Sequence, residues 1–247
     1  MINFILKFFS HNILFLTGDT LVLDRWLWLK KRVKLFNRSF KFIDMGCGGG
    51  QFVIGLNKLN FLCDGVDIDT DKLKKAKDRA KLFGLKRENI FMNKISNIKK
   101  KNYDCLITFE CVEHILDDQK FINDCSQFLK KDGYLFLTTP FKYLNPITSG
   151  DLEISKIEDG GHVRIGYDKE MLFSLLDKYF YDIKISFCSG FLSQKLTYIY
   201  RRLYVINKYI AMLVILPLRL IQIIFDKYVT KLLNYQQFSI CVEARRK

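Results

Sequence analysis

The sequence predicts an α/β protein built around a doubly wound, seven-stranded and mostly parallel sheet. Short apolar runs alternate with helical patterns from residue 40 to residue 138, which is typical of a chain that adds one strand and one helix at a time. A turn with four glycines at 46–50 follows the first apolar run, and a second run at 61–67 ends in an acid. This order favours a sheet that binds a nucleotide-like ligand at its edge.

The glycine turn has a specific pattern. Asp44 stands two residues before Gly46, and Gly48 and Gly50 follow, which gives D-x-G-x-G-x-G. Glycine provides the positive φ angles of a tight turn, and its missing Cβ lets the backbone approach a ligand. A dinucleotide-binding turn would require a glycine where Gln51 stands, so the chain departs from that pattern.

Polar residues end several of the expected strands. Asp44 ends the first, Asp67 the second, Glu110 follows the fourth and Thr138 ends the fifth. Because the carboxyl ends of parallel strands meet at one edge, we expect these residues to surround one crevice. Asp67 lies 21 residues after Gly46, the spacing at which an acid accepts hydrogen bonds from ribose hydroxyls.

The remaining elements follow from periodicity. An N-terminal helical extension, residues 1–40, holds apolar residues at helical spacing from Phe4 to Leu16 and again from Asp19 to Val33. The α/β domain is expected to span 41–187 plus 238–247, with a helical insertion at 188–237 before the last strand. Further strands are expected at 90–93, 103–109, 134–138, 182–187 and 238–244, and helices at 71–83 (after Thr70 as N-cap), 119–129 and 169–179.

Composition limits the class of protein. The 247 residues are 49% hydrophobic, which excludes a disordered chain. The net charge of +14 favours an anionic partner or simply reflects a lysine-rich surface. Seven cysteines form neither a C-x-x-C pair nor a cluster with zinc spacing, so we expect no bound metal and a cytoplasmic, reducing location.

The motifs together resemble one family. D-x-G-x-G-x-G at 44–50, YDCLITFECVEHI at 103–115 and GYLFLTTP at 133–140 are similar to class I S-adenosylmethionine-dependent methyltransferases. The resemblance is to the small-molecule type, the group that includes ubiquinone-type O-methyltransferases, and it covers well over half of the chain. It implies a Rossmann-like fold and S-adenosyl-L-methionine as the cofactor.

The resemblance also assigns roles to the cofactor-binding residues. Asp44 and the turn residues would hold the methionine end, Asp67 the ribose, and Ile68 the adenine ring, while Glu110 would lie beneath the sulfonium. The family usually has an adenine-binding acid where Asn93, Lys94 and Ile95 stand here. A charged lysine cannot accept a hydrogen bond, so we expect backbone and apolar contacts, with Ile95 among them. The turn residues in this assignment are Gly46, Cys47, Gly48 and Gly50.

The segment EDGGHVRIGY, in the long connection at 139–167, supplies candidates for the acceptor side. We expect that connection to act as a lid, because connections of this length often do. A hydroxyl acceptor needs a general base, for which His162 is the first candidate and His114 the second, and Arg164 would clamp an anion. Equally, His162 can be a solvated loop residue, and His114 can simply close the end of a helix. Other candidate bases are Glu113, Glu158 and Asp159.

The insertion carries an apolar run, Ile210–Phe225, that Pro217, Arg219 and Gln222 interrupt. It therefore falls short of a continuous membrane span. Arg219, Gln222 and Asp226 recur at helical spacing and form one polar stripe on an apolar helix. A hairpin that dips into an anionic membrane surface or covers a greasy substrate fits this pattern, and so does one that packs on the domain or on a second subunit.

The function expected from the sequence is methyl transfer to a small molecule. The acceptor would be a hydroxyl of a glycan, a lipid-linked or a quinone-like compound. A nucleic-acid methyltransferase is an alternative that the charge suggests, but FECVEH stands where such enzymes often have an N/D-P-P-Y/F motif. A non-catalytic, membrane-attached module of the same fold is the second alternative, and oligomerisation is open.

Overall fold

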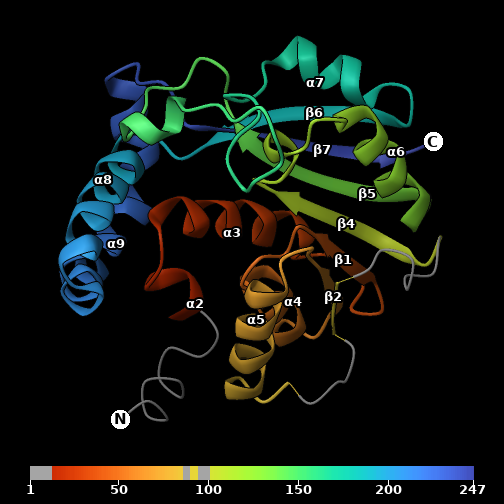
Figure 1. Cartoon of the computed structure of the whole chain (residues 1–247), viewed down its shortest axis with the longest axis horizontal. Coiled ribbons are helices and arrows are strands. Elements are labelled where there is room, and N and C mark those ends of the chain that lie inside the picture. Colours follow the sequence, from red (N-terminus) through yellow and green to blue (C-terminus); the bar gives the residue numbers. More distant parts are fainter. Residues whose placement is uncertain (1–12, 86–89, 94–100) are drawn as a thin grey trace.

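The computed structural model describes residues 13–85, 90–93 and 101–247, and at its centre lies one seven-stranded sheet (Figure 1). The strand order is β3-β2-β1-β4-β5-β7-β6, and β7 runs antiparallel to both neighbours while every other pair is parallel. The predicted fold class is confirmed. The strands are β1 Lys41–Met45, β2 Leu62–Val66, β3 Phe91–Met92, β4 Tyr103–Phe109, β5 Leu129–Pro140, β6 Phe180–Cys188 and β7 Ser239–Arg246.

Helices cover both faces of the sheet because successive strand side chains point to opposite sides. Phe42 and Ile107 pack with helices α2 to α5, whereas Ile43 and Leu106 pack with α6 and α7. The helices are α2 Ile13–Leu16, α3 Thr20–Val33, α4 Gln51–Lys58, α5 Thr70–Leu82, α6 Asp118–Phe128, α7 Lys169–Leu176, α8 Phe191–Ile206 and α9 Lys208–Leu232, with 3-10 turns η3 Val112–His114 and η4 Ser149–Leu152.

The N-terminal extension belongs to the core. Trp26 and Leu29 of α3 are buried against the sheet, and Trp28 stacks edge-on against Phe109 and Phe136. α3 begins after Asp19, as predicted, because the Asp19 side chain accepts a hydrogen bond from the backbone N–H of Leu21. The helix expected from Phe4 to Leu16 lies outside the described residues as far as residue 12, and its described end is α2.

Two predicted boundaries are wrong. Asp69, not Thr70, caps α5, since its carboxylate accepts hydrogen bonds from the backbone N–H groups of Asp71 and Lys72. β5 begins at Leu129, five residues before the strand start expected at residue 134. An irregularity there shifts the register with β4, and Asp132 takes a positive φ of 60° that absorbs the bend.

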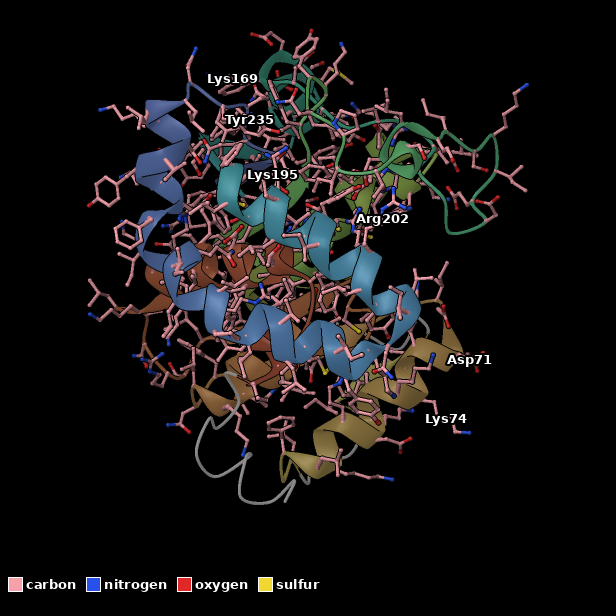
Figure 2. The ribbon with its side chains drawn as sticks, turned by 90° about the vertical axis from the view of Figure 1, so that its left-hand side faces the viewer. Asp71, Lys74, Lys169, Lys195, Arg202 and Tyr235 are labelled. Atoms are coloured by element: carbon pink, nitrogen blue, oxygen red, sulfur yellow. The ribbon has the colours of Figure 1, made fainter. Side chains whose placement is uncertain are left out.

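The insertion forms a hairpin of α8 and α9 that stands at one end of the molecule (Figure 1), and Figure 2 views this hairpin face on. α9 runs unbroken for 25 residues through Pro217, so the residues that interrupt the apolar run do not interrupt the helix. Proline removes one backbone hydrogen bond without ending this helix. In the described part of the chain, α9 is the one helix that is long and apolar enough to cross a membrane, judged by length and composition.

Candidate functional site

The carboxyl ends of four neighbouring strands form the site. β2, β1, β4 and β5 are adjacent and parallel, so their ends lie at one edge of the sheet. Asp67, Asp44, Glu110 and Thr138 stand at these ends. The structure therefore brings together the four residues that the sequence placed around one crevice.

In the glycine turn between β1 and α4, Gly46 and Gly50 are tightly packed, whereas Gly48 borders open space. Gly46, Gly48 and Gly50 have positive φ angles of 79°, 48° and 73°. A Cβ on Gly46 would meet Sγ of Cys111 at 2.5 Å, and a Cβ on Gly50 would meet the ring of Phe91 at 2.7 Å. A Cβ on Gly48 would have no neighbour within 4 Å among the residues that the structure describes. Packing explains two glycines, and open space for a ligand fits the third.

Asp67 ties the second strand to this turn. One carboxylate oxygen accepts a hydrogen bond from the Gly48 N–H at 2.7 Å, and the other accepts one from the Asp69 N–H at 2.9 Å. Each carboxylate oxygen keeps further acceptor capacity. The predicted contact with ribose hydroxyls is sterically and chemically compatible with this placement and stays a prediction.

Asp44 is a buried acid that forms no ion pair with any described residue. Its side chain is 2% exposed, and its Oδ2 atom has no hydrogen-bond partner among the described residues. Burial, and then the neighbouring Asp67, raise the pKa of Asp44 well above its usual range. A cationic group placed here would relieve both effects. The residues at this edge therefore fit the positively charged methionine end of S-adenosylmethionine.

Residues expected near the adenine are only partly described. Ile68 is 84% exposed directly after Asp67, which leaves its side chain free to cover a ring. Asn93 is exposed, whereas Lys94 and Ile95 lie outside the described residues. Cys47 is buried, and burial raises the pKa of its thiol, so this residue contributes to the turn as a neutral side chain.

Glu110 is held by an arginine that the sequence analysis missed. Arg25 of α3 forms an ion pair with Oε2 of Glu110 at 2.9 Å, and Thr138 donates a hydrogen bond to Oε1 at 3.1 Å. Glu110 itself has a positive φ of 50°. The sequence pattern that could have indicated this pairing is a basic residue, Arg25, on the apolar side of a helix. Its partner could not be read, because it lies far away in the chain.

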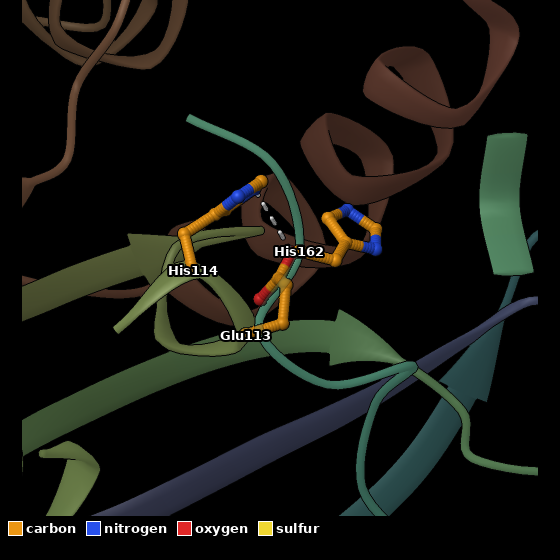
Figure 3. Close-up of side chains that lie close together, drawn as sticks. All are labelled: Glu113, His114 and His162. Atoms are coloured by element: carbon orange, nitrogen blue, oxygen red, sulfur yellow. Dashed lines mark ion pairs between the residues drawn. The ribbon is translucent and has the colours of Figure 1, made fainter. Parts of the chain in front are cut away.

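Glu113, His114 and His162 lie close together (Figure 3). The charge of Glu110 acts on Glu113, so this cluster adjoins the end of β4. Glu113 is fully buried; Thr139 donates to its Oε2 at 3.0 Å, and its Oε1 lies 3.9 Å from Nε2 of His114. The rings of His114 and His162 pack edge to face at 4.7 Å. Ligand atoms of all three residues lie within 4.8 Å of one another, so they could also hold a metal ion, which the sequence did not suggest.

His162 has the properties of a proton acceptor. Its Nδ1 is buried and has no hydrogen-bond partner in the described part of the protein. Burial, and then the neighbouring His114, lower the pKa of His162 below its usual 6.5, so the ring is neutral at pH 7. His114, in contrast, already shares a hydrogen bond of 2.9 Å between Nδ1 and the Gly161 carbonyl.

Arg164 does not support the predicted anion clamp. Its Nη1 donates to the carbonyls of Val112 and Ile115 and to the Tyr167 hydroxyl, and its Nη2 donates to Leu116. The guanidinium is therefore engaged in fixing the connection 139–167 to η3. The Val163 N–H adds a bond of 2.9 Å to the Glu113 carbonyl. Both contacts hold His162 in place, so Arg164 is a positioning residue.

Comparison with known proteins defines the family. A family model described as a methyltransferase domain matches residues 36–164, slightly more than half of the chain. The chain belongs to the class I S-adenosylmethionine-dependent methyltransferases. In this methyltransferase the matched region contains the glycine turn, Asp67, Glu110 and His162.

Relatives and solved structures agree with the assignment. The methyltransferase is 33% identical to a ubiquinone biosynthesis O-methyltransferase of Pelagibacter ubique over 107 residues. These residues cover 43% of this chain and 45% of that protein. It is similar in fold to a SAM-dependent methyltransferase of Archaeoglobus fulgidus, with 17% identity and a TM-score of 0.56, and the match covers 96% of this chain and 99% of that one. It is also similar in fold to phosphoethanolamine N-methyltransferase 2 of Haemonchus contortus in complex with S-adenosyl-L-methionine. The identity is 15%, the TM-score is 0.60, and the match covers 99% of this chain and 60% of that one.

The chain spans less than two thirds of the length of the curated relatives it matches, for example 45% of the Pelagibacter protein. The similarity to the solved structures lies below 25% identity and concerns the fold.

Proposed function

We propose that this methyltransferase transfers the methyl group of S-adenosylmethionine to a hydroxyl of a small molecule, with His162 as the general base. One observation carries the proposal: a neutral imidazole, with a buried Nδ1 that has no hydrogen-bond partner among the described residues, stands beside Glu113, three residues after Glu110 at the end of β4. The relative from Pelagibacter, named as an O-methyltransferase, supports a hydroxyl acceptor.

The cofactor supplies an electrophilic methyl carbon on a cationic sulfur. The acceptor oxygen forms the new bond to that carbon while the carbon–sulfur bond breaks and its electron pair stays on sulfur. The hydroxyl proton moves to His162, which is ready to accept it because burial and His114 keep the ring neutral. Asp44 and Asp67 hold the cofactor, and the anchored connection holds the base, so positioning provides much of the rate enhancement.

Arg25 and Thr138 keep Glu110 fixed at the fourth strand end. The Glu110 carboxylate adds negative charge next to the cationic sulfur, which favours binding of the charged cofactor over its neutral product. We place this enzyme in the cytoplasm. The acceptors that fit the proposal are glycan, lipid-linked and quinone-like compounds.

The test is product formation. Purified enzyme is incubated with S-adenosylmethionine and a panel of hydroxyl acceptors, a catechol among them, and S-adenosylhomocysteine and methylated product are measured. We expect stoichiometric formation of both with native enzyme and a large loss with His162→Ala. An enzyme that binds the cofactor and yields methylated amines but never methylated hydroxyls contradicts the proposal. A chain that binds no cofactor is a non-catalytic module.

A further inference from the structure

The outward side of α9 is apolar over the whole length of the helix. Exposed residues recur three or four positions apart, which places them on one side. In Figure 2 the hairpin lies in front of the sheet, so the exposed side of the hairpin faces away from the sheet. The residues that define this outer face are Leu213, Val214, Leu220, Ile221, Ile224 and Phe225.

The inward side of α9 is apolar in its first half, where Ala211 and Ile215 pack against Tyr200, and polar in its second half, which reverses the usual arrangement for a surface helix. Arg219 and Gln222 are each 1% exposed. Arg219 donates to the carbonyls of Leu16 and Gly18, and Gln222 donates to Asp24 at 2.8 Å and to Ser193 at 3.0 Å. These bonds fix the rotation of the helix and therefore keep the apolar side outside.

Asp226 fixes the base of the hairpin in the same way. Its carboxylate accepts hydrogen bonds from the backbone N–H groups of Gly190, Leu192 and Ser193, at the start of α8. α9 is thus attached over about two turns, from Arg219 to Asp226, to α3, α8 and the segment before α3. If α9 crossed a bilayer, Arg219 and Asp226 would have to leave these partners and enter hydrocarbon, which is unfavourable.

The charge of the hairpin identifies the surface that would cover it. Residues 191–232 contain seven Lys and Arg residues and one acid, Asp226, which is already engaged in hydrogen bonds. Exposed basic residues flank the outer face on both helices, and exposed tyrosines lie among them. A second copy of the hairpin would bring like charges together, whereas anionic lipid would neutralise them. The exposed basic residues are Lys195, Arg202, Lys208, Lys227 and Lys231.

We propose that the hairpin of α8 and α9 lies in the surface of an anionic lipid bilayer, with the outer face of α9 among the acyl chains and α9 parallel to the membrane plane. An amphipathic helix with a basic border binds membranes in this way. The hairpin leaves the sheet at Cys188 of β6 and returns at Ser239 of β7, which pair with each other. β6 runs parallel to β4 and β5, so this is the edge that carries the candidate site.

Membrane binding would therefore bring the crevice near the bilayer and favour an amphiphilic acceptor. This consequence rests on the proposed function, whereas binding of the hairpin to lipid does not. The two can be separated by measuring lipid binding in the absence of acceptor.

The experiment is co-sedimentation of the full chain with vesicles of phosphatidylcholine and phosphatidylglycerol, compared with phosphatidylcholine alone. The test variant is Leu213→Gln with Leu220→Gln, on the outer face. The matched control is Leu35→Gln with Leu82→Gln, which makes the same change at exposed leucines outside the hairpin. Calorimetric titration with S-adenosylmethionine verifies that every variant is folded.

We expect the native chain and the control to sediment with the anionic vesicles. The test variant should bind them about tenfold or more weakly, because two exposed leucines that would enter the acyl chains are lost. High salt should weaken native binding. Absence of native binding overturns the proposal, and so does a stable dimer that the test variant dissociates. Resistance of membrane-bound native chain to extraction with alkaline carbonate would show a spanning helix and also overturn it.

Discussion

Replacement of Gly48 by alanine tests whether the cofactor occupies the open space beside this residue, separately from any effect on the stability of the fold. Gly48 has a φ of 48°, and a Cβ there would meet no atom of the described part of the chain within 4 Å. Gly84, after α5, has a φ of 70° and the same open surroundings but lies outside the site. Alanine at either position should therefore strain the backbone equally, while alanine at 48 should also occupy space that the cofactor needs.

The magnitudes follow from the backbone geometry. A left-handed conformation costs an L-residue about 1–2 kcal/mol. Alanine also reduces the conformational entropy of the unfolded chain, which stabilises the folded state by about 0.4–1 kcal/mol. Each variant should lose about 1 kcal/mol of stability, or about 2–4 °C in Tm for a chain of this size. Gly50→Ala should lose about 1–3 kcal/mol more, because its Cβ would meet the Phe91 ring at 2.7 Å.

Thermal unfolding and calorimetric titration with S-adenosylmethionine check these expectations. Gly48→Ala should match Gly84→Ala in Tm but bind the cofactor at least about tenfold more weakly, which corresponds to about 1.4 kcal/mol. Equal cofactor affinity in Gly48→Ala and Gly84→Ala would refute the reasoning, because the open space at the turn would then not be the space that the cofactor fills.

Three further changes test the site and the hairpin. Asp67→Ala should weaken cofactor binding by roughly 1–3 kcal/mol through unpaired ribose hydroxyls, and unchanged affinity in calorimetry would contradict the ribose contact. His162→Ala should lower turnover by about 10²–10⁴-fold while cofactor affinity stays the same. Burial, and then His114, lower the pKa of His162, so native turnover should fall only at a pH below the range in which an ordinary histidine gains its proton. An equal loss of turnover in His114→Ala would argue against His162 as the base. Burial raises the pKa of Asp24 to about 6, so the folded state binds this proton more tightly than the unfolded chain, and the contribution to stability falls as pH rises from about 4 to about 6. Asp24→Asn should therefore be more stable than the native chain at pH 7 by about 1–3 kcal/mol and equal to it near pH 4, as measured by urea unfolding, and a difference that does not grow with pH would contradict the assignment.

Local patterns along the chain were enough to predict much of the site. The apolar run of β1 followed by Gly46, Gly48 and Gly50 specifies a tight strand-to-helix turn, because few other residues tolerate these φ angles. Asp44 and Asp67 fall at the ends of adjacent parallel strands, so the alternation of strands and helices alone places them together.

Contacts between distant segments decided the rest. The pairing of Arg25 with Glu110, and the meeting of Glu113 with His162, join elements far apart in the chain. Arg164 shows the same limit: its position in a glycine-rich segment suggested an anion, whereas the fold places it against the carbonyls of η3. No spacing encodes such contacts, because they depend on which surfaces the folded sheet brings together.

The orientation of α9 illustrates the boundary most clearly. The sequence alone determined that Arg219, Gln222 and Asp226 form one polar stripe on an apolar helix, since helical spacing fixes which residues share a side. Only the tertiary structure decided that this stripe points inward. The physical reason is that buried carbonyl, carboxylate and hydroxyl groups of α3, α8 and the preceding turn are available to pair with it, and pairing outweighs the exposure of the apolar side.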